Sequence, residues 1–139
     1  MGDAMKRKSL LICLGGLAAL LAAVLLWPFV IGTRPFKSLT AVDIQSATVA
    51  LYPPDAEFTL TPEEVERLVP LLREVVVYEK DDRYREYSGQ LCLFTLTLTD
   101  GTQTTVGAYN PALYVDDVCR RTKYGPCEAL NHFANTLRH

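Results

Sequence analysis

The chain has 139 residues, of which 49% are hydrophobic and 22% charged, and its formal net charge is −2. This length fits a single domain, and an aromatic content of 9% argues against a disordered chain. Four cysteines are too few for a disulfide-dense scaffold, and a net charge near zero gives no support to a nucleic-acid-binding protein.

A segment near the N-terminus predicts a transmembrane helix. Residues 9–33 form a run of 25 residues without a charged side chain, and Lys6, Arg7 and Lys8 precede it. A bilayer core needs about 20 apolar helical residues, and the positive-inside rule places the basic end in the cytoplasm. We therefore predict a single-pass protein of the cell membrane, with a cytoplasmic arm over 1–8, a transmembrane helix over 9–32, a linker over 33–42 and an extracytoplasmic domain over 43–139.

The alternative to this anchor is a cleaved signal peptide. The apolar region of a signal peptide usually has about 7–15 residues, and a small-residue cleavage site follows it. The run in this chain is longer, and Val30-Ile31-Gly32 is a poor substitute for such a site. We favour the uncleaved anchor and keep cleavage as the alternative.

The outer part of the chain is acidic. Residues 34–139 hold 11 Lys or Arg against 15 Asp or Glu, a net charge of −4. A domain of this charge should not adhere to anionic lipid or polymer through its bulk charge.

The domain opens with two strands and a helix. Asp43–Tyr52 and Glu57–Leu60 read as strands, separated by Pro53-Pro54-Asp55. Thr61 and Glu64 form the pattern of a capping box, with Pro62 at the first helical position. We predict a helix from Pro62 that kinks at Pro70 and ends near Arg73 or Glu74.

Strand patterns dominate the middle of the chain. Val75–Glu79 is either a strand or the end of the helix, and its consecutive valines favour the strand. Lys80–Ser88 is a charged loop, and Gln90–Leu98 alternates so that Cys92 and Phe94 share one face.

The turn at Asp100-Gly101 sets the register of the next hairpin. A two-residue turn would place Gly107 opposite Phe94. A three-residue loop with Gly101 left-handed instead places Val106 opposite Phe94 and Ala108 opposite Cys92. We prefer the second register because it keeps apolar residues on the core face.

The remaining elements complete an α+β fold. Leu113–Val115 and Val118–Thr122 predict a hairpin around Asp116-Asp117, and Pro126–Leu137 predicts a final amphipathic helix. The fold class we expect is an N-terminal transmembrane helix followed by an antiparallel sheet with two helices on one face, the threonine-rich other face remaining in water.

Cysteines and tyrosines supply the candidate site residues. In an oxidising compartment Cys119 and Cys127 could form a disulfide, although another pairing, or buried thiols without any bridge, are the alternatives. In the charged loop, Tyr84, Arg85 and Tyr87 combine the residue types that enrich contact surfaces, so we predict a ligand-binding or partner-binding role. The alternative is that each ring packs on the edge of the core with its hydroxyl in water.

No pattern in the sequence predicts catalysis, a cofactor or a metal. Glu128 and His132 are four residues apart and fit a surface pair on a helix. Cys127 and His132 are five apart, which turns their side chains away from each other on a helix. The chain has no HExxH, CxxC, GxSxG or phosphate-cradling glycine loop.

Three segments resemble a known group of proteins: GQLCLFTLTLTDGT (89–102), AYNP (108–111) and KYGPCEALNHFAN (123–135). They are similar to small, mostly uncharacterised membrane-anchored proteins of anaerobic Gram-positive bacteria. The resemblance covers about residues 38–138 and implies no catalytic residue. The resemblance implies a glycine in the late hairpin, where this chain has Asp117.

The expected function is therefore extracytoplasmic binding or sensing of a ligand or of another envelope protein, without enzymatic activity. The alternative is a structural or accessory subunit that acts through its transmembrane helix. The small residues Gly15, Gly16, Ala18 and Ala19 would permit close helix contact, although the segment lacks a GxxxG pair.

Overall fold

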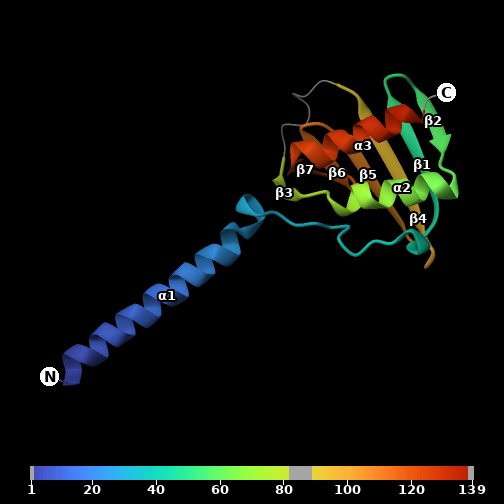
Figure 1. Ribbon diagram of the computed structural model, residues 1–139. Helices are drawn as coiled ribbons and strands as arrows, with labels where there is room; N and C mark the ends of the chain where they lie inside the picture. Colours follow the sequence, from blue (N-terminus) through green and yellow to red (C-terminus); the bar gives the residue numbers. More distant parts are fainter. Residues whose placement is uncertain (1, 82–88, 138–139) are drawn as a thin grey trace.

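A computed structural model describes residues 2–81 and 89–137. The described residues form an N-terminal apolar helix and a mixed α+β domain, with 40% helix and 35% strand (Figure 1). The elements in chain order are α1 (Gly2–Val30), a short 3₁₀ turn (Ala41–Asp43), β1 (Ile44–Tyr52), β2 (Ala56–Thr59), α2 (Pro62–Arg73), β3 (Val77–Lys80), β4 (Leu91–Leu98), β5 (Gln103–Tyr109), β6 (Ala112–Val115), β7 (Val118–Thr122) and α3 (Tyr124–Thr136).

The domain is built on one antiparallel sheet of seven strands. Their spatial order is β2-β1-β4-β5-β6-β7-β3, so β2 and β3 are the two edges. Both α2 and α3 lie across the same face of this sheet (Figure 1). The fold class predicted from the sequence is confirmed.

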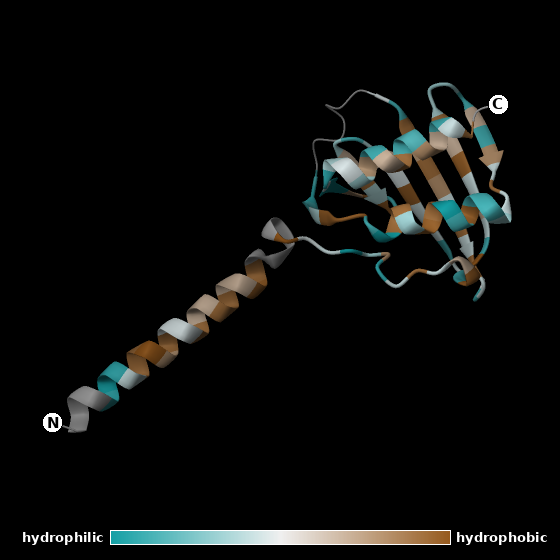
Figure 2. Cartoon of the chain, viewed as in Figure 1, coloured by the Kyte–Doolittle hydropathy of each residue, from teal (hydrophilic) through white to brown (hydrophobic). Residues whose placement is uncertain are grey.

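The core lies between the sheet and the two helices. Alternate residues of the strands face the helices, and Figure 2 shows the resulting alternation of apolar and polar positions along them. The fully buried side chains with the largest volume are Phe94, Leu51, Leu68, Leu72, Leu96, Leu113 and Leu130. Burial of this apolar surface supplies the main driving force for folding.

Helix α2 begins where its capping residues predict. The Glu64 amide donates to Thr61 Oγ1 at 3.2 Å, and the Thr61 amide donates to Glu64 Oε1 at 2.9 Å. Pro62 takes the first helical position, and the helix ends at Arg73 with Pro70 inside it. The predicted start and end are both confirmed.

The β4–β5 register is also confirmed. Phe94 pairs with Val106 and Cys92 pairs with Ala108. Gly101 has a φ of +88°, and the Leu98 amide donates to the Thr102 carbonyl at 2.8 Å, which closes the three-residue loop.

The segment after α2 is a strand, but it is shorter than predicted. The Val75 amide donates to the Leu72 carbonyl at 3.1 Å, so the chain is still turning away from α2 there. Strand β3 starts only at Val77 and pairs with β7.

Helix α1 projects away from the domain (Figures 1 and 2). Its stretch Lys6–Leu25 is long and apolar enough to cross a membrane, and none of this stretch is buried against the rest of the protein. An apolar helix that serves as the core of a soluble domain would instead be covered by other elements.

Candidate functional site

Residues 32–39, which connect α1 to the domain, pack against it and are called the strap below. The Thr33 amide donates to the Val77 carbonyl at 2.8 Å, and the Val77 amide donates back to the Thr33 carbonyl at 2.9 Å. This reciprocal pair is an isolated antiparallel bridge on β3, at the edge of the sheet. The chain that leaves α1 is therefore tied to the sheet at its first extended residue.

Gly32 permits this close approach. Its φ is +77°, and a Cβ built at this position would lie 2.7 Å from Val76 Cγ1 and 2.8 Å from the Val77 carbonyl oxygen. Contacts this short exclude any side chain, and the positive φ also disfavours a residue other than glycine.

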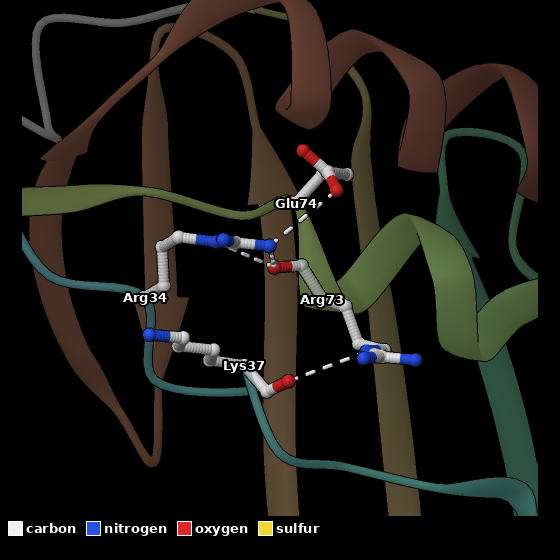
Figure 3. Close-up of polar contacts among 4 residues, drawn as sticks. All are labelled: Arg34, Lys37, Arg73 and Glu74. Atoms are coloured by element: carbon white, nitrogen blue, oxygen red, sulfur yellow. Dashed lines mark hydrogen bonds and ion pairs between the residues drawn. The ribbon is translucent and has the colours of Figure 1, made fainter.

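Two arginines hold the strap against the end of α2 (Figure 3). Arg34 donates from Nε and Nη2 to the Arg73 carbonyl at 2.9 and 2.7 Å, and from Nη2 to Glu74 Oε1 at 3.4 Å. Arg73 in turn donates from Nε to the Lys37 carbonyl at 3.2 Å. The Arg34 guanidinium thus binds a carbonyl at a helix C-terminus, where the helix dipole favours a cation.

The strap also contributes to the core. Phe36 is buried in the hydrophobic cluster, and Leu39 packs against it. The segment that the sequence suggested as part of a linker is therefore packed into the domain, and it covers the sheet beside α2.

A groove runs between the strap and the β4–β5 hairpin, with a volume of about 490 Å³. One wall is the strap from Arg34 to Leu39, and the other includes Leu98, Thr99 and Asp100. This volume falls within the range of small-ligand sites, and the groove is open to solvent rather than enclosed.

Charged groups in the groove differ in their partners. Asp100 accepts hydrogen bonds from the Thr102 hydroxyl at 2.6 Å and the Thr102 amide at 2.9 Å, which lower the pKa of its carboxyl. Asp43 accepts from the Thr40 hydroxyl at 2.7 Å. The Lys37 side chain is exposed and makes no hydrogen bond or ion pair with the described residues. The groove therefore offers a cation that is available to an anionic ligand.

A second polar cluster joins α3 to the start of β4. Asn135 donates from Nδ2 to Gln90 Oε1 at 2.7 Å, and Gln90 donates from Nε2 to Asn135 Oδ1 at 3.2 Å and to the Pro53 carbonyl at 2.9 Å. Asn131 donates from Nδ2 to Cys92 Sγ at 3.3 Å. These amides satisfy one another, so the cluster fixes α3 on the sheet and leaves no polar group aimed at a ligand.

The buried thiols are poor nucleophiles. Burial raises the pKa of Cys92 to about 11 and that of Cys127 to about 12. A reactive cysteine has a lowered pKa and an exposed sulfur atom, and these two have neither.

The structure describes only some of the predicted site residues. Tyr84, Arg85 and Tyr87 fall outside the described residues, so their binding role stays a prediction. Cys119 pairs with Tyr114 on the face of the sheet without helices, whereas Cys127 lies in the core on α3. Their sulfur atoms are not bonded to each other, and because they lie on opposite sides of the sheet the geometry disfavours the disulfide.

Glu128 and His132, which the sequence predicts as a surface pair on a helix, both lie on α3. The Glu128 carboxylate accepts a hydrogen bond from Tyr124, one helical turn earlier, and raises the pKa of that phenol. His132 is exposed on α3. Within residues 2–81 and 89–137, no cluster of three or more His, Cys, Asp or Glu side chains could hold a metal ion.

Comparison with protein-family models, with curated proteins and with solved structures gives no match. The resemblance carried by the three sequence segments therefore stays a prediction. The structure explains part of those segments physically, since Gln90, Asn131 and Asn135 meet in the amide cluster.

Proposed function

We propose that the protein is a single-pass membrane protein whose C-terminal domain lies outside the cytoplasm and binds or senses a ligand there without catalysing a reaction. The observation that carries this proposal is the exposed apolar helix α1, joined to a folded domain by a packed strap. The cluster of Lys6, Arg7 and Lys8 before the helix supports a cytoplasmic N-terminus.

The groove beside the strap is the favoured ligand site. A ligand bound there contacts the strap, and the strap continues directly into α1. Binding energy that differs between two positions of the strap would shift the equilibrium between them, which is the physical requirement for a sensor. Because Lys37 is a lining cation without an ion pair to the described residues, the proposed ligand carries an anionic group, for which a carboxylate serves as the probe.

A second candidate function is that of an accessory subunit held through α1. Nothing lies within 4 Å of a Cβ built on Gly15 or Gly16, so this side of the helix is open to a neighbouring helix. Small residues permit the close backbone approach on which helix association in membranes depends.

Cysteine accessibility in intact cells tests anchoring and orientation. A membrane-impermeant maleimide should label Asp55→Cys, which lies between β1 and β2, and should label Lys8→Cys only after permeabilisation. The reverse labelling pattern, or release of the chain from membranes by alkaline carbonate, would contradict the proposal.

A ligand titration separates the two candidates. The full chain in lipid nanodiscs is titrated with a set of N-acetyl dipeptides, whose terminal carboxylate suits Lys37, and the amide resonances are followed by NMR. Binding should give saturable shifts at Lys37 and Asp100, should vanish in Lys37→Gln, and should persist when residues 9–31 are replaced by an unrelated apolar helix. The absence of such shifts would count against the groove and in favour of the accessory role.

A further inference from the structure

The net charge of the domain conceals a strong separation of charge. Cationic side chains gather where α1 joins the domain, on the strap, the end of α2, strands β3 and β7, and the residue that follows β7. This set is called the basic edge below, and its members are Arg34, Lys37, Arg73, Lys80, Arg120, Arg121 and Lys123.

The carboxylates of this region are partly neutralised by arginines. Glu79 Oε1 lies 2.8 Å from Arg121 Nε, and Arg121 holds the pKa of Glu79 below its usual range. Glu74 Oε1 lies 3.4 Å from Arg34. Lys37, Lys80 and Lys123 are exposed, and none of them forms an ion pair with a carboxylate of the described residues.

The opposite edge of the sheet is acidic. Strand β2, the turn before it and the first turns of α2 carry five carboxylates, with Arg67 beside them. These acidic residues are Asp55, Glu57, Glu63, Glu64 and Glu66. Cations outnumber the carboxylates Glu74, Glu79 and Asp81 at the β3 end, and carboxylates outnumber cations at the β2 end, so the two edges of the sheet carry opposite net charge.

The positive end lies beside the predicted membrane span. Helix α1 contacts β3, and Thr33 pairs with Val77 only three residues after α1 ends. The Lys123 amide donates to the Val76 carbonyl at 3.1 Å, which places this lysine next to the same junction. Figure 1 shows β3 as the strand nearest the end of α1, with β2 on the far side of the domain.

We propose that the basic edge docks on anionic phospholipid headgroups of the leaflet from which α1 emerges. This rests on the proposed function, because α1 must span the bilayer. Attraction between exposed charges acts over about 10 Å, so cations next to the span reach the headgroups and the acidic edge does not. The acidic edge is repelled by the same surface, and docking therefore fixes which side of the domain faces solvent.

The test uses the full chain in nanodiscs with a gadolinium-chelating headgroup lipid, which broadens the amide resonances of residues close to the bilayer. Broadening at Thr33, Lys80 and Lys123, relative to Asp55 and Glu57, should be greater in discs that contain phosphatidylglycerol than in phosphatidylcholine discs. High salt should remove the difference because it screens exposed charges.

Paired charge substitutions test whether lysines of the basic edge cause the docking. Each cation near an anionic surface contributes about fivefold to binding, so Lys80→Gln with Lys123→Gln should lower the ratio of docked to undocked domain by about 25-fold. The matched control Glu57→Gln with Glu63→Gln, on the acidic edge, should not lower it. Neither pair touches the groove or the contacts of the strap.

Two outcomes overturn the proposal. One is equal broadening of the basic edge in both lipid compositions, and the other is shifts at Lys80 and Lys123 with inorganic phosphate but not with anionic lipid. Co-elution of the chain with the discs is the separate readout of insertion. A chain that does not co-elute contradicts the proposed membrane span, whereas a chain that co-elutes without any effect of lipid composition contradicts docking alone.

Discussion

The thiols of Cys92 and Cys127 couple the stability of the domain to alkaline pH. Burial raises the pKa of Cys92 to about 11 and that of Cys127 to about 12, so both stay protonated in the folded state at pH values where the unfolded chain ionises. The unfolded state then binds fewer protons, and stability falls as the pH rises.

We predict that the urea midpoint of the full chain in detergent decreases between about pH 9 and pH 12. The double variant Cys92→Ala with Cys127→Ala should lose part of this pH dependence, whatever its stability at neutral pH. At pH 8 both native thiols should react with iodoacetamide about a hundredfold more slowly than an exposed cysteine does. Rapid alkylation of either thiol in the folded protein would show that this thiol is not buried.

Asp117 occupies a backbone conformation that suits glycine better. Asp116 and Asp117 have φ values of 48° and 69°, the left-handed backbone that a two-residue hairpin of type I′ requires. Asp116 Oδ1 accepts hydrogen bonds from the Thr104 hydroxyl and the Thr105 amide, both at 2.9 Å, whereas Asp117 is exposed.

We therefore predict that Asp117→Gly raises the free energy of unfolding by about 1 kcal/mol, as measured by chemical denaturation. Asp116→Gly is the matched control. It relieves the same backbone strain but removes two hydrogen bonds, so it should bring no gain. An equal gain from both variants would mean that the Asp116 contacts contribute nothing.

At the scale of elements, the strap is packed against the domain in the same way as a regular element. Three kinds of interaction hold it in place. They are the backbone bridge to β3, the arginine hydrogen bonds at the end of α2, and the burial of Phe36 in the core. At Gly32 the strap lies so close to β3 that a Cβ would meet Val76 and the Val77 carbonyl within 3 Å.

The variant Gly32→Ala tests this packing. Its Cβ would overlap Val76 and the Val77 carbonyl at a φ of +77°, so we expect a loss of about 3 kcal/mol in the free energy of unfolding. Gly101→Ala is the control, because Gly101 also has a positive φ but has open space around it. It should cost about 1 kcal/mol. Equal losses for the two variants would mean that the strap is not closely packed.

The elements that the sequence predicted well are those with local signals. The capping residues Thr61 and Glu64 define the start of α2 without help from the rest of the chain. Alternation along β4, together with one glycine at Gly101, sets the register of the β4–β5 hairpin. In each case the information lies within a few neighbouring residues.

The strap was missed because its partners are far away in the sequence. Arg34 binds a carbonyl 39 residues later, and Thr33 pairs with Val77. A run such as GTRPFKSL has neither helical nor strand periodicity, so a linker was the natural interpretation. Phe36 is the one signal that would have indicated packing, since a flexible linker has no reason to carry a large aromatic side chain.

The charge separation was missed for a related reason. Net charge is a sum over the sequence, and the net charge of −4 for residues 34–139 predicted no adhesion to anionic surfaces. Only the sheet order places Lys80 and Lys123 on the edge formed by β3 and β7, which α1 contacts, and places Glu57 at the opposite edge. The proposed docking therefore depends on local charge next to the bilayer rather than on net charge.

At the scale of the whole molecule, the strap is the segment that joins the domain to the apolar helix α1, the proposed membrane span. A flexible tether would let the domain rotate freely above the bilayer, and ligand binding would then have no effect on α1. In the proposed sensing role, the packed strap would pass a displacement of the groove wall to the end of α1. Both the proposed sensing role and the proposed headgroup docking depend on this connection.

Hydrogen exchange at Thr33 tests this connection most directly. In the full chain in nanodiscs, the Thr33 amide bonded to the Val77 carbonyl should exchange at least about a hundredfold more slowly than an unstructured amide, because exchange requires the strap to open. The same protection should be lost in Gly32→Ala. Exchange of Thr33 at the rate of an unstructured chain, while the amides of β4 stay protected, would show that the strap is a loose tether and would contradict the account.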